Sequence, residues 1–322
     1  MKEENRKIFE RQHYALIGKN AGLQICRWTK KSLLNSGECY KQQFYGIKSH
    51  RCCQMAPCIV LCQNKCLHCW RAIEHTEGDF LAEKEADLPE LLIEESIKMQ
   101  RKMLTGFKGN KKTSMKKWHE AQEPSQFAIS LSGEPTLYPY LGKFIKMLRE
   151  KRKTTFLVTN GLNPEAIKKL EKENALPTQL YLSLNSPNNK EYEKWHNSTK
   201  KDAWKRFNKT LSLLKKLKGK TRTVIRMTLV RGKNMRDEDI SGYAKLIKKA
   251  SPLFLECKGF MSVGFSRKRL GYETMPVMKE VLEFSKKLGK ELKIDILAKN
   301  ELSRVVLLGK KEDKKRMKIT KN

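Results

Sequence analysis

Acidic residues are scarce in this sequence. Its 322 residues include 35 Asp and Glu against 68 Lys and Arg, which gives a formal net charge of +33 at pH 7. Thermophilic proteins also contain many lysines, but they usually gain glutamate together with lysine. A surface with such an excess of positive charge attracts polyanions. We therefore expect a nucleic acid to be the partner of this chain.

Long apolar runs are missing as well. No stretch approaches the ~18 apolar residues of a membrane-spanning helix, and the first residues, MKEENRKIFERQHY, are charged or polar. We therefore expect a cytoplasmic protein that does not contact membranes. Eight of the nine cysteines lie between residues 26 and 69. In a reducing compartment such cysteines bind metals more often than they form disulfides.

The order of apolar and amphipathic segments predicts an α/β fold. Six strands are predicted, at residues 58–62, 127–132, 154–160, 179–185, 222–230 and 253–264. Amphipathic segments between them carry helix-starting signals, such as Pro89 at the start of 89–105 and Asn163 before Pro164. Strands separated by helices pair in parallel. Because these strands are apolar on both faces, helices must cover the sheet, or the sheet must curve into a barrel.

A CxxxCxxC array directly follows the first predicted strand and contains Cys62, Cys66 and Cys69. A structural zinc site uses four ligands, and His68 is badly placed to be the fourth. Cubane iron–sulfur clusters are also held by thiolates, and three thiolates leave one iron free for another ligand. From these residues alone, both kinds of metal centre remain open.

The array, its following aromatic residue and its place in the strand and helix series resemble the radical S-adenosylmethionine (SAM) superfamily. The resemblance implies an incomplete (β/α)6 TIM-like barrel and a 4Fe-4S cluster whose open iron binds SAM. It also implies that residues at the carboxyl ends of the predicted strands bind SAM, namely Ser132, Gly133, Glu134, Thr159, Asn160, Ser183, Asn185 and Val230. Two positions depart from the superfamily pattern. Ser132 replaces the first glycine of its Gly-Gly-Glu motif, and Asn185 stands where many relatives carry an acid.

A second set of cysteines, Cys26, Cys39 and Cys52, precedes the array with twelve residues between successive members. Together with segments 39–52, 131–139 and 258–270, these cysteines resemble the archaeal tRNA 4-demethylwyosine synthases. This resemblance implies a second 4Fe-4S cluster on the three cysteines, with Cys53 as an alternative to Cys52. The alternatives are a zinc knuckle or three buried thiols, and the long spacings disfavour them. We expect Cys58 and Cys257 to pack as small hydrophobic residues.

The same resemblance implies a substrate chemistry. The family condenses N1-methylguanosine 37 of tRNA(Phe) with pyruvate to form 4-demethylwyosine, using a 5'-deoxyadenosyl radical and a Schiff base between a lysine and pyruvate. Lys41 matches the Schiff-base lysine, and Lys258 is the reserve candidate. Burial or a neighbouring cation such as Arg51 is expected to lower the pKa of Lys41. We also expect an external electron donor, because no additional doubly wound domain is present, and a monomer.

Two basic insertions, at 108–120 and 190–209, interrupt the strand and helix series. They contain Trp118, Trp195 and Trp204, which either cap the core or stack on RNA bases. The expected division of the chain is an arm (1–57) with the second-cluster cysteines, a barrel (58–300) and a basic tail (301–322). The alternative functions are another two-cluster radical SAM enzyme, such as a tRNA methylthiotransferase, and a non-enzymatic RNA-binding protein stapled by zinc.

Overall fold

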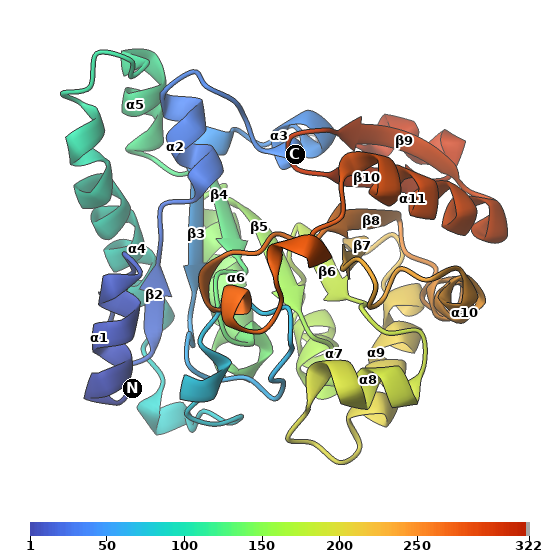
Figure 1. Cartoon of the computed structure of the whole chain (residues 1–322). Coiled ribbons are helices and arrows are strands. Elements are labelled where there is room, and N and C mark those ends of the chain that lie inside the picture. The colour runs from blue at the N-terminus through green and yellow to red at the C-terminus, as the bar shows by residue number, and fades with distance from the viewer. Residues whose placement is uncertain (320–322) are drawn as a thin grey trace.

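A computed structural model describes residues 1–319, so the last three residues of the predicted tail lie outside the described part of the chain. These residues form one ten-stranded sheet with helices packed along it (Figure 1). Its strands are β1 (Ala15–Ile17), β2 (Ala21–Leu23), β3 (Cys52–Ala56), β4 (Gln126–Ile129), β5 (Thr154–Thr159), β6 (Gln179–Ser183), β7 (Arg222–Leu229), β8 (Phe254–Gly259), β9 (Asp295–Asn300) and β10 (Val305–Gly309). The α-helices are α1 (Glu3–Arg11), α2 (Arg27–Leu33), α3 (Tyr40–Tyr45), α4 (Pro89–Leu104), α5 (Met115–Ala121), α6 (Leu141–Glu150), α7 (Pro164–Lys172), α8 (Asn189–His196), α9 (Ala203–Lys216), α10 (Ile240–Ala250) and α11 (Met278–Leu292).

The centre of the sheet is a run of parallel strands, β3 to β8, in chain order. Antiparallel strands extend both edges, with β2 and β1 beyond β3, and β10 and β9 beyond β8. Because β1 and β9 end this order, the sheet stays open within residues 1–319. The predicted incomplete barrel with parallel strands is therefore confirmed, while the four antiparallel strands were not predicted.

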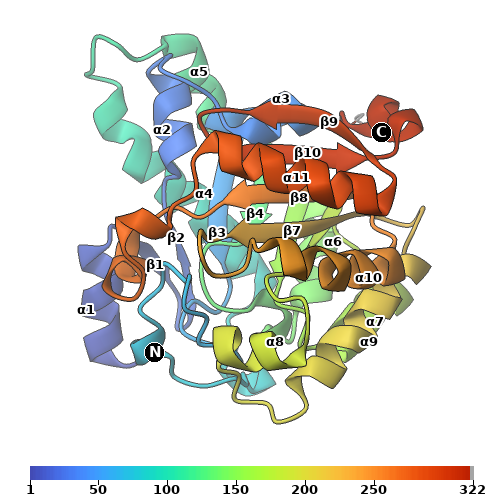
Figure 2. The ribbon, with the colours of Figure 1, turned by 45° about the vertical axis from the view of Figure 1, so that its right-hand side comes forward.

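Helices pack against the outer side of the sheet, as Figure 2 shows for α10 and α11. Pro89 and Pro164 occupy the first turns of α4 and α7, where the missing N–H of proline costs no hydrogen bond. Each helix turns an apolar stripe inward, for example Leu92, Ile93 and Leu104 of α4. Within residues 1–319, none of the helices has the length and apolar character that a bilayer crossing requires.

The first parallel strand does not lie where the sequence predicts it. Residues 58–62 form a turn outside the sheet, with an isolated bridge between Leu61 and Gly78, and β3 at Cys52–Ala56 is the first parallel strand. Cys58, Ile59 and Val60 are nevertheless fully buried. This loop has the composition of a strand because it is buried. Composition alone therefore could not distinguish a buried loop from a buried strand.

The predicted basic tail is also partly wrong. Residues 305–309 form β10, which is buried along its whole length between β8 and β9. Beyond it, a 3-10 turn at Lys311–Arg316 leads back over the sheet. There Arg222 of β7 donates hydrogen bonds to the backbone oxygens of Arg316 and Met317. This part of the chain therefore belongs to the sheet and its packing.

The two basic insertions are largely helical. Residues 108–120 lead into α5, and residues 190–209 include α8 and the start of α9. Their tryptophans belong to the core, since Trp118 Nε1 donates to Leu104 O at 2.9 Å, Trp195 is buried, and Trp204 stacks on Phe207. The core-capping alternative therefore holds. The cations of these insertions remain exposed, namely Lys108, Lys111, Lys112, Lys116, Lys190, Lys194, Lys201, Lys205 and Lys209.

Candidate active site

The CxxxCxxC array lies in the loop between β3 and α4, where Cys62, Cys66 and Cys69 are each partly buried. Burial raises the pKa of Cys62 to about 11. Burial and then the neighbouring thiols Cys69 and Cys62 raise the pKa of Cys66 well above its usual value. Thiols that shift one another in this way lie close together. The structure thus gathers the three predicted ligands into one group.

Arg71 faces this thiol group from inside the fold. Burial acts to lower its pKa, but the charges of Cys62, Cys69 and Cys66 outweigh burial and raise it. Its Nη2 donates to Asn64 O at 3.3 Å, while the buried Nη1 has no hydrogen-bond partner within residues 1–319. A buried cation with a spare donor beside three thiols fits a centre that carries negative charge.

Glu134 ties the carboxyl ends of β4 and β5 together. Its carboxylate accepts hydrogen bonds from the Thr159 hydroxyl and the Asn160 backbone N–H, both at 2.7 Å. It also accepts from the hydroxyl and N–H of Thr136. The Asn160 side chain continues the connection, because its Nδ2 lies 3.1 Å from Gln63 Oε1 in the cysteine loop. Burial raises the pKa of Glu134 in spite of these donors.

Ser132 and Gly133 press against the same loop. Ser132 Oγ donates to Ile59 O at 2.8 Å. Gly133 has a φ of +69°, and a Cβ built on it would lie 1.9 Å from the carbonyl oxygen of Cys58. Only glycine satisfies both the left-handed backbone and this close approach.

Replacing Gly133 with alanine should therefore destabilise the protein by about 3 kcal/mol, because the Cβ meets rigid backbone rather than a movable side chain. Urea unfolding of the anaerobically purified protein measures this effect. Gly109→Ala is the matched control, since an added Cβ there meets nothing within 4 Å. Equal urea midpoints for Gly133→Ala and Gly109→Ala would contradict the close approach of Gly133 to the backbone of Cys58.

The remaining predicted SAM residues lie on β6 and β7. Ser183 ends β6 opposite Arg226. The Asn185 side chain is buried, and its Oδ1 accepts a hydrogen bond from Thr228 N at 2.8 Å. Val230 is fully buried in an apolar cluster with Trp195, Phe260 and Leu270. All eight predicted SAM residues thus lie at the carboxyl ends of neighbouring parallel strands, on the same side as the cysteine loop.

The upstream cysteines gather toward the other end of the strands. Cys26 and Cys39 directly precede α2 and α3, and Cys52 is the first residue of β3. Burial and then Cys26 raise the pKa of Cys39 to about 11, and burial raises that of Cys52. Cys53 points instead into the main apolar core. Side chains alternate along a strand, so Cys52, and not Cys53, faces Cys26 and Cys39. Cys58 and Cys257 are fully buried, as predicted.

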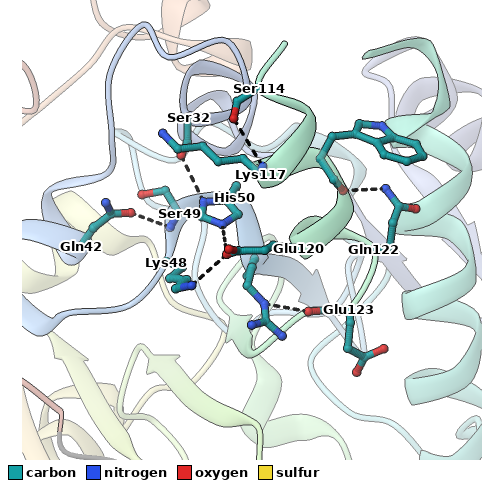
Figure 3. A network of polar contacts seen from close by, with 12 residues as sticks. Ser32, Gln42, Lys48, Ser49, His50, Ser114, Lys117, Glu120, Gln122 and Glu123 are labelled. Carbon is teal, nitrogen blue, oxygen red and sulfur yellow. Dashed lines mark hydrogen bonds and ion pairs between the residues drawn. The ribbon is translucent and has the colours of Figure 1, made fainter. Parts of the chain in front are cut away.

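A polar network holds the cysteine-bearing arm in place (Figure 3). The Ser49 hydroxyl accepts from Cys39 N at 2.9 Å, and Ser49 N donates to Gln42 Oε1 at 2.8 Å. Next to it, Glu120 of α5 lies 2.8 Å from both His50 Nε2 and Lys48 Nζ. These contacts lower the pKa of Glu120 to about 2. The first basic insertion therefore braces the arm that carries the upstream cysteines.

The side chain of Lys41, on α3, points toward the face of the sheet that β5 and β6 form. Its Nζ lies 5.0 Å from the ring centres of both Phe156 and Tyr181. Burial and then the charge of Arg226 lower the pKa of Lys41. Arg51, the predicted neighbouring cation, instead donates to Glu123 O at 2.9 Å, so that expectation was wrong. Burial and Arg226 also lower the pKa of Lys258, to about 8.

Arg226 and Glu256 were missed by the sequence interpretation. They are paired across β7 and β8, with Arg226 Nε 2.8 Å from Glu256 Oε2. Glu256 is fully buried and also accepts from the hydroxyls of Tyr40 at 2.9 Å and Tyr45 at 2.6 Å. These tyrosines begin and end α3, so Glu256 fixes the helix that carries Lys41. The available signal was a charged residue inside each of two apolar strands.

The spacing of the candidate ligands matters for the kind of metal centre that they could hold. Within residues 1–319, no three side chains of His, Cys, Asp or Glu are grouped closely enough to hold a single metal ion. Zinc requires its ligands at about 2.0–2.3 Å. The thiolates of a cubane bind different irons and therefore stand further apart. Each cysteine group offers three thiols as ligands.

Comparison with known proteins matches residues 57–244 to the radical SAM superfamily and residues 249–310 to a family described as wyosine base formation. The S-adenosyl-L-methionine-dependent tRNA 4-demethylwyosine synthase of Pyrococcus abyssi is 46% identical, over 96% of this chain and 89% of that protein. The Methanocaldococcus jannaschii protein of the same name is 39% identical, over 95% of this chain and 96% of that one. Among solved structures, TYW1 with a lysine-pyruvate adduct bound has a TM-score of 0.85 and 36% identity, covering 99% of this chain and 98% of that one. Archaeal TYW1 has a TM-score of 0.79 and 33% identity, covering 99% of this chain and 100% of that one.

Proposed function

This chain belongs to the radical SAM superfamily and, within it, to the tRNA 4-demethylwyosine synthases, and on that premise we propose that it condenses N1-methylguanosine 37 of tRNA(Phe) with pyruvate to form 4-demethylwyosine. The observation that carries the proposal is similarity over nearly the whole chain. These similarities favour this function over a methylthiotransferase or a zinc-stapled protein.

Membership of the superfamily implies SAM and an iron–sulfur cluster. We assign that cluster to Cys62, Cys66 and Cys69, and a second 4Fe-4S cluster to Cys26, Cys39 and Cys52. When bound and reduced, the first cluster and SAM supply a 5'-deoxyadenosyl radical. The buried guanidinium of Arg71 offsets the charge of the first thiolate group.

The eight residues at the strand ends would surround SAM. Glu134 holds β4 and β5 in register through Thr159 and Asn160. Asn160 in turn orients Gln63 in the cysteine loop. Val230 and its apolar neighbours form a dry wall on β7, where a flat aromatic group could pack. The Ser132 hydroxyl and the Asn185 Oδ1 already bond within the protein, so we assign both residues a role in shaping the site.

Lys41 is the proposed nucleophile for pyruvate. Its lowered pKa favours the neutral amine, whose lone pair would attack the keto carbon before water leaves and an imine forms. Glu256 holds α3 through Tyr40 and Tyr45, so the amine has a fixed position. Lys258 remains the reserve candidate, because its pKa is lowered in the same interior.

Recognition of tRNA rests on charge. The exposed lysines of the two basic insertions lie on α5, α8 and α9 or on the loops next to them, and Trp118, Trp195 and Trp204 pack these helices against the core. Such surfaces bind phosphates, and the target base must leave its stack to reach a buried site. We further propose that the chain works as a cytoplasmic monomer and takes its electron from a separate donor protein.

A single reaction mixture tests this function. Anaerobic enzyme with dithionite, SAM, pyruvate and N1-methylated tRNA(Phe) should yield 5'-deoxyadenosine and the tricyclic base, detected by mass spectrometry of digested tRNA. Omitting pyruvate, or using tRNA with unmethylated guanosine 37, should remove the tricyclic base. Formation of the same amount of product without pyruvate would overturn the proposal.

A further inference from the structure

The end of α8 is bound directly to the CxxxCxxC loop. Lys65 N donates to His196 O at 2.8 Å, and Leu67 N donates to Trp195 O at 3.1 Å. Just beyond the helix, Thr199 N donates to Gln63 O at 2.8 Å. Three backbone hydrogen bonds thus join the second basic insertion to the loop on both sides of Cys66. This segment is therefore part of the wall of the cysteine site.

These bonds place the His196 ring against one thiol. His196 Nδ1 lies 3.0 Å from Cys66 Sγ, and the residue is only 4% exposed. The ring packs on Tyr192, with 4.3 Å between ring centres, so it cannot turn freely. Its Nε2 is buried without a hydrogen-bond partner within residues 1–319.

Ligation of iron decides where the proton of His196 sits. A Cys66 thiolate bound to iron has no proton and can only accept a hydrogen bond. The short Nδ1–Sγ distance is then favourable only if Nδ1 carries the hydrogen. Nε2 becomes the bare nitrogen, which agrees with the lack of an acceptor around it.

We propose that His196 tunes the reduction potential of the SAM-binding cluster by donating an Nδ1–H···S hydrogen bond to Cys66. The inference rests on the proposed function, in which Cys66 ligates that cluster. One electron from a reduced flavin or iron–sulfur protein converts the oxidised cluster to its reduced form, and no proton is transferred. The added negative charge strengthens an N–H···S bond, so the bond favours the reduced state.

The short distance makes this contact distinct from the other donor contacts to the thiols. Cys62 Sγ accepts from Asn64 N at 3.4 Å and from Asn160 Nδ2 at 3.8 Å, and Arg71 faces the group from the following turn. His196 comes from a helix 130 residues further along the chain. His196 is therefore a positioning residue that acts through Cys66.

Redox titration followed by electron paramagnetic resonance tests the role of His196. In the full-length anaerobic protein, the reduced signal that changes on adding SAM identifies the relevant cluster. In the His196→Leu variant, reduction of this cluster should be roughly tenfold less favourable, which lowers its reduction potential by about 59 mV for one electron. His196→Asn should keep a potential close to that of the unmodified protein, because its amide can place an N–H near the position of Nδ1.

Ser198→Ala is the matched control for loosening the helix end, since it removes the hydroxyl bonds to Gln63 O at 3.1 Å and from Lys200 N at 3.2 Å but leaves His196 in place, and its potential should not change. Equal potentials for His196→Leu and the unmodified protein would overturn the inference, as would equal potentials for the Asn and Leu variants. If no signal responds to SAM even in the unmodified protein, it is the proposed function that fails. Iron content measured for each variant separates a shifted potential from a lost cluster.

Discussion

A Lys41→Ala variant is expected to lose all covalent capture of pyruvate when the mixture is reduced with borohydride, while Lys258→Ala retains it. Both lysines have lowered pKa values in the same interior. Lys41 is the better nucleophile because α3 is anchored at both ends by Glu256, and its amine faces the rings of Phe156 and Tyr181. The amine of Lys258 is instead directed toward Ser303 O at 3.4 Å.

Mass spectrometry of proteolytic peptides measures the capture, because the reduced adduct stays attached to one lysine. In the protein without substitutions, the peptide that carries the reduced adduct should contain Lys41. No such peptide is expected from the Lys41→Ala variant. A Lys41→Ala protein that still captures pyruvate, together with a Lys258→Ala protein that does not, would move the role to Lys258. Unchanged circular dichroism and iron content are required of both variants, so that loss of capture is not loss of fold.

The layout of the proposed SAM residues was predictable from sequence because parallel strands end at a common edge. Ser132, Gly133 and Glu134 follow β4, and Thr159 and Asn160 follow β5, so their order along the chain already implied that they meet. The contacts between Glu134 and both Thr159 and Asn160 bear this out. Small polar residues and a glycine directly after an apolar run were sufficient signals.

Strand boundaries were less predictable where burial does not imply pairing. The loop around Cys58 and Ile59 is as apolar as a strand, while β3 begins with the partly buried Cys52. β9 contains three exposed residues, among them Asp295 and Lys299, and only Leu297 is buried, so its sequence is typical of a surface segment. Only its pairing with the buried β10 gives it strand structure. Local composition cannot supply such long-range pairing.

Contacts between distant segments were beyond sequence reasoning. Arg226 and Glu256 each look like isolated charges in apolar strands, and only the register of β7 and β8 makes them a pair. His196 lay in an insertion interpreted through its lysines and tryptophans, and the contact with Cys66 depends on how α8 ends. Geometry of this kind follows from tertiary packing rather than from spacing along the chain.

The two adjacent cysteines at the start of β3 should differ sharply when replaced. Cys52→Ala is expected to lose about half of the bound iron, because it removes one of three thiolates from one of two proposed clusters. Cys53→Ala should keep all of it. The Cys52 thiol shares its surroundings with Cys26, Cys39 and Lys41, whereas Cys53 is buried in the main apolar core.

Iron and sulfide analysis of anaerobically reconstituted protein measures the difference, with Cys62→Ala as the matched variant for the other cluster. Cys62→Ala should also lose about half of the iron and, in addition, all SAM cleavage to 5'-deoxyadenosine. Loss of iron from Cys53→Ala with full iron in Cys52→Ala would reverse the assignment. Full iron in both would mean that the upstream thiols hold no cluster, and Lys41 would then lie beside free thiols rather than beside a metal centre.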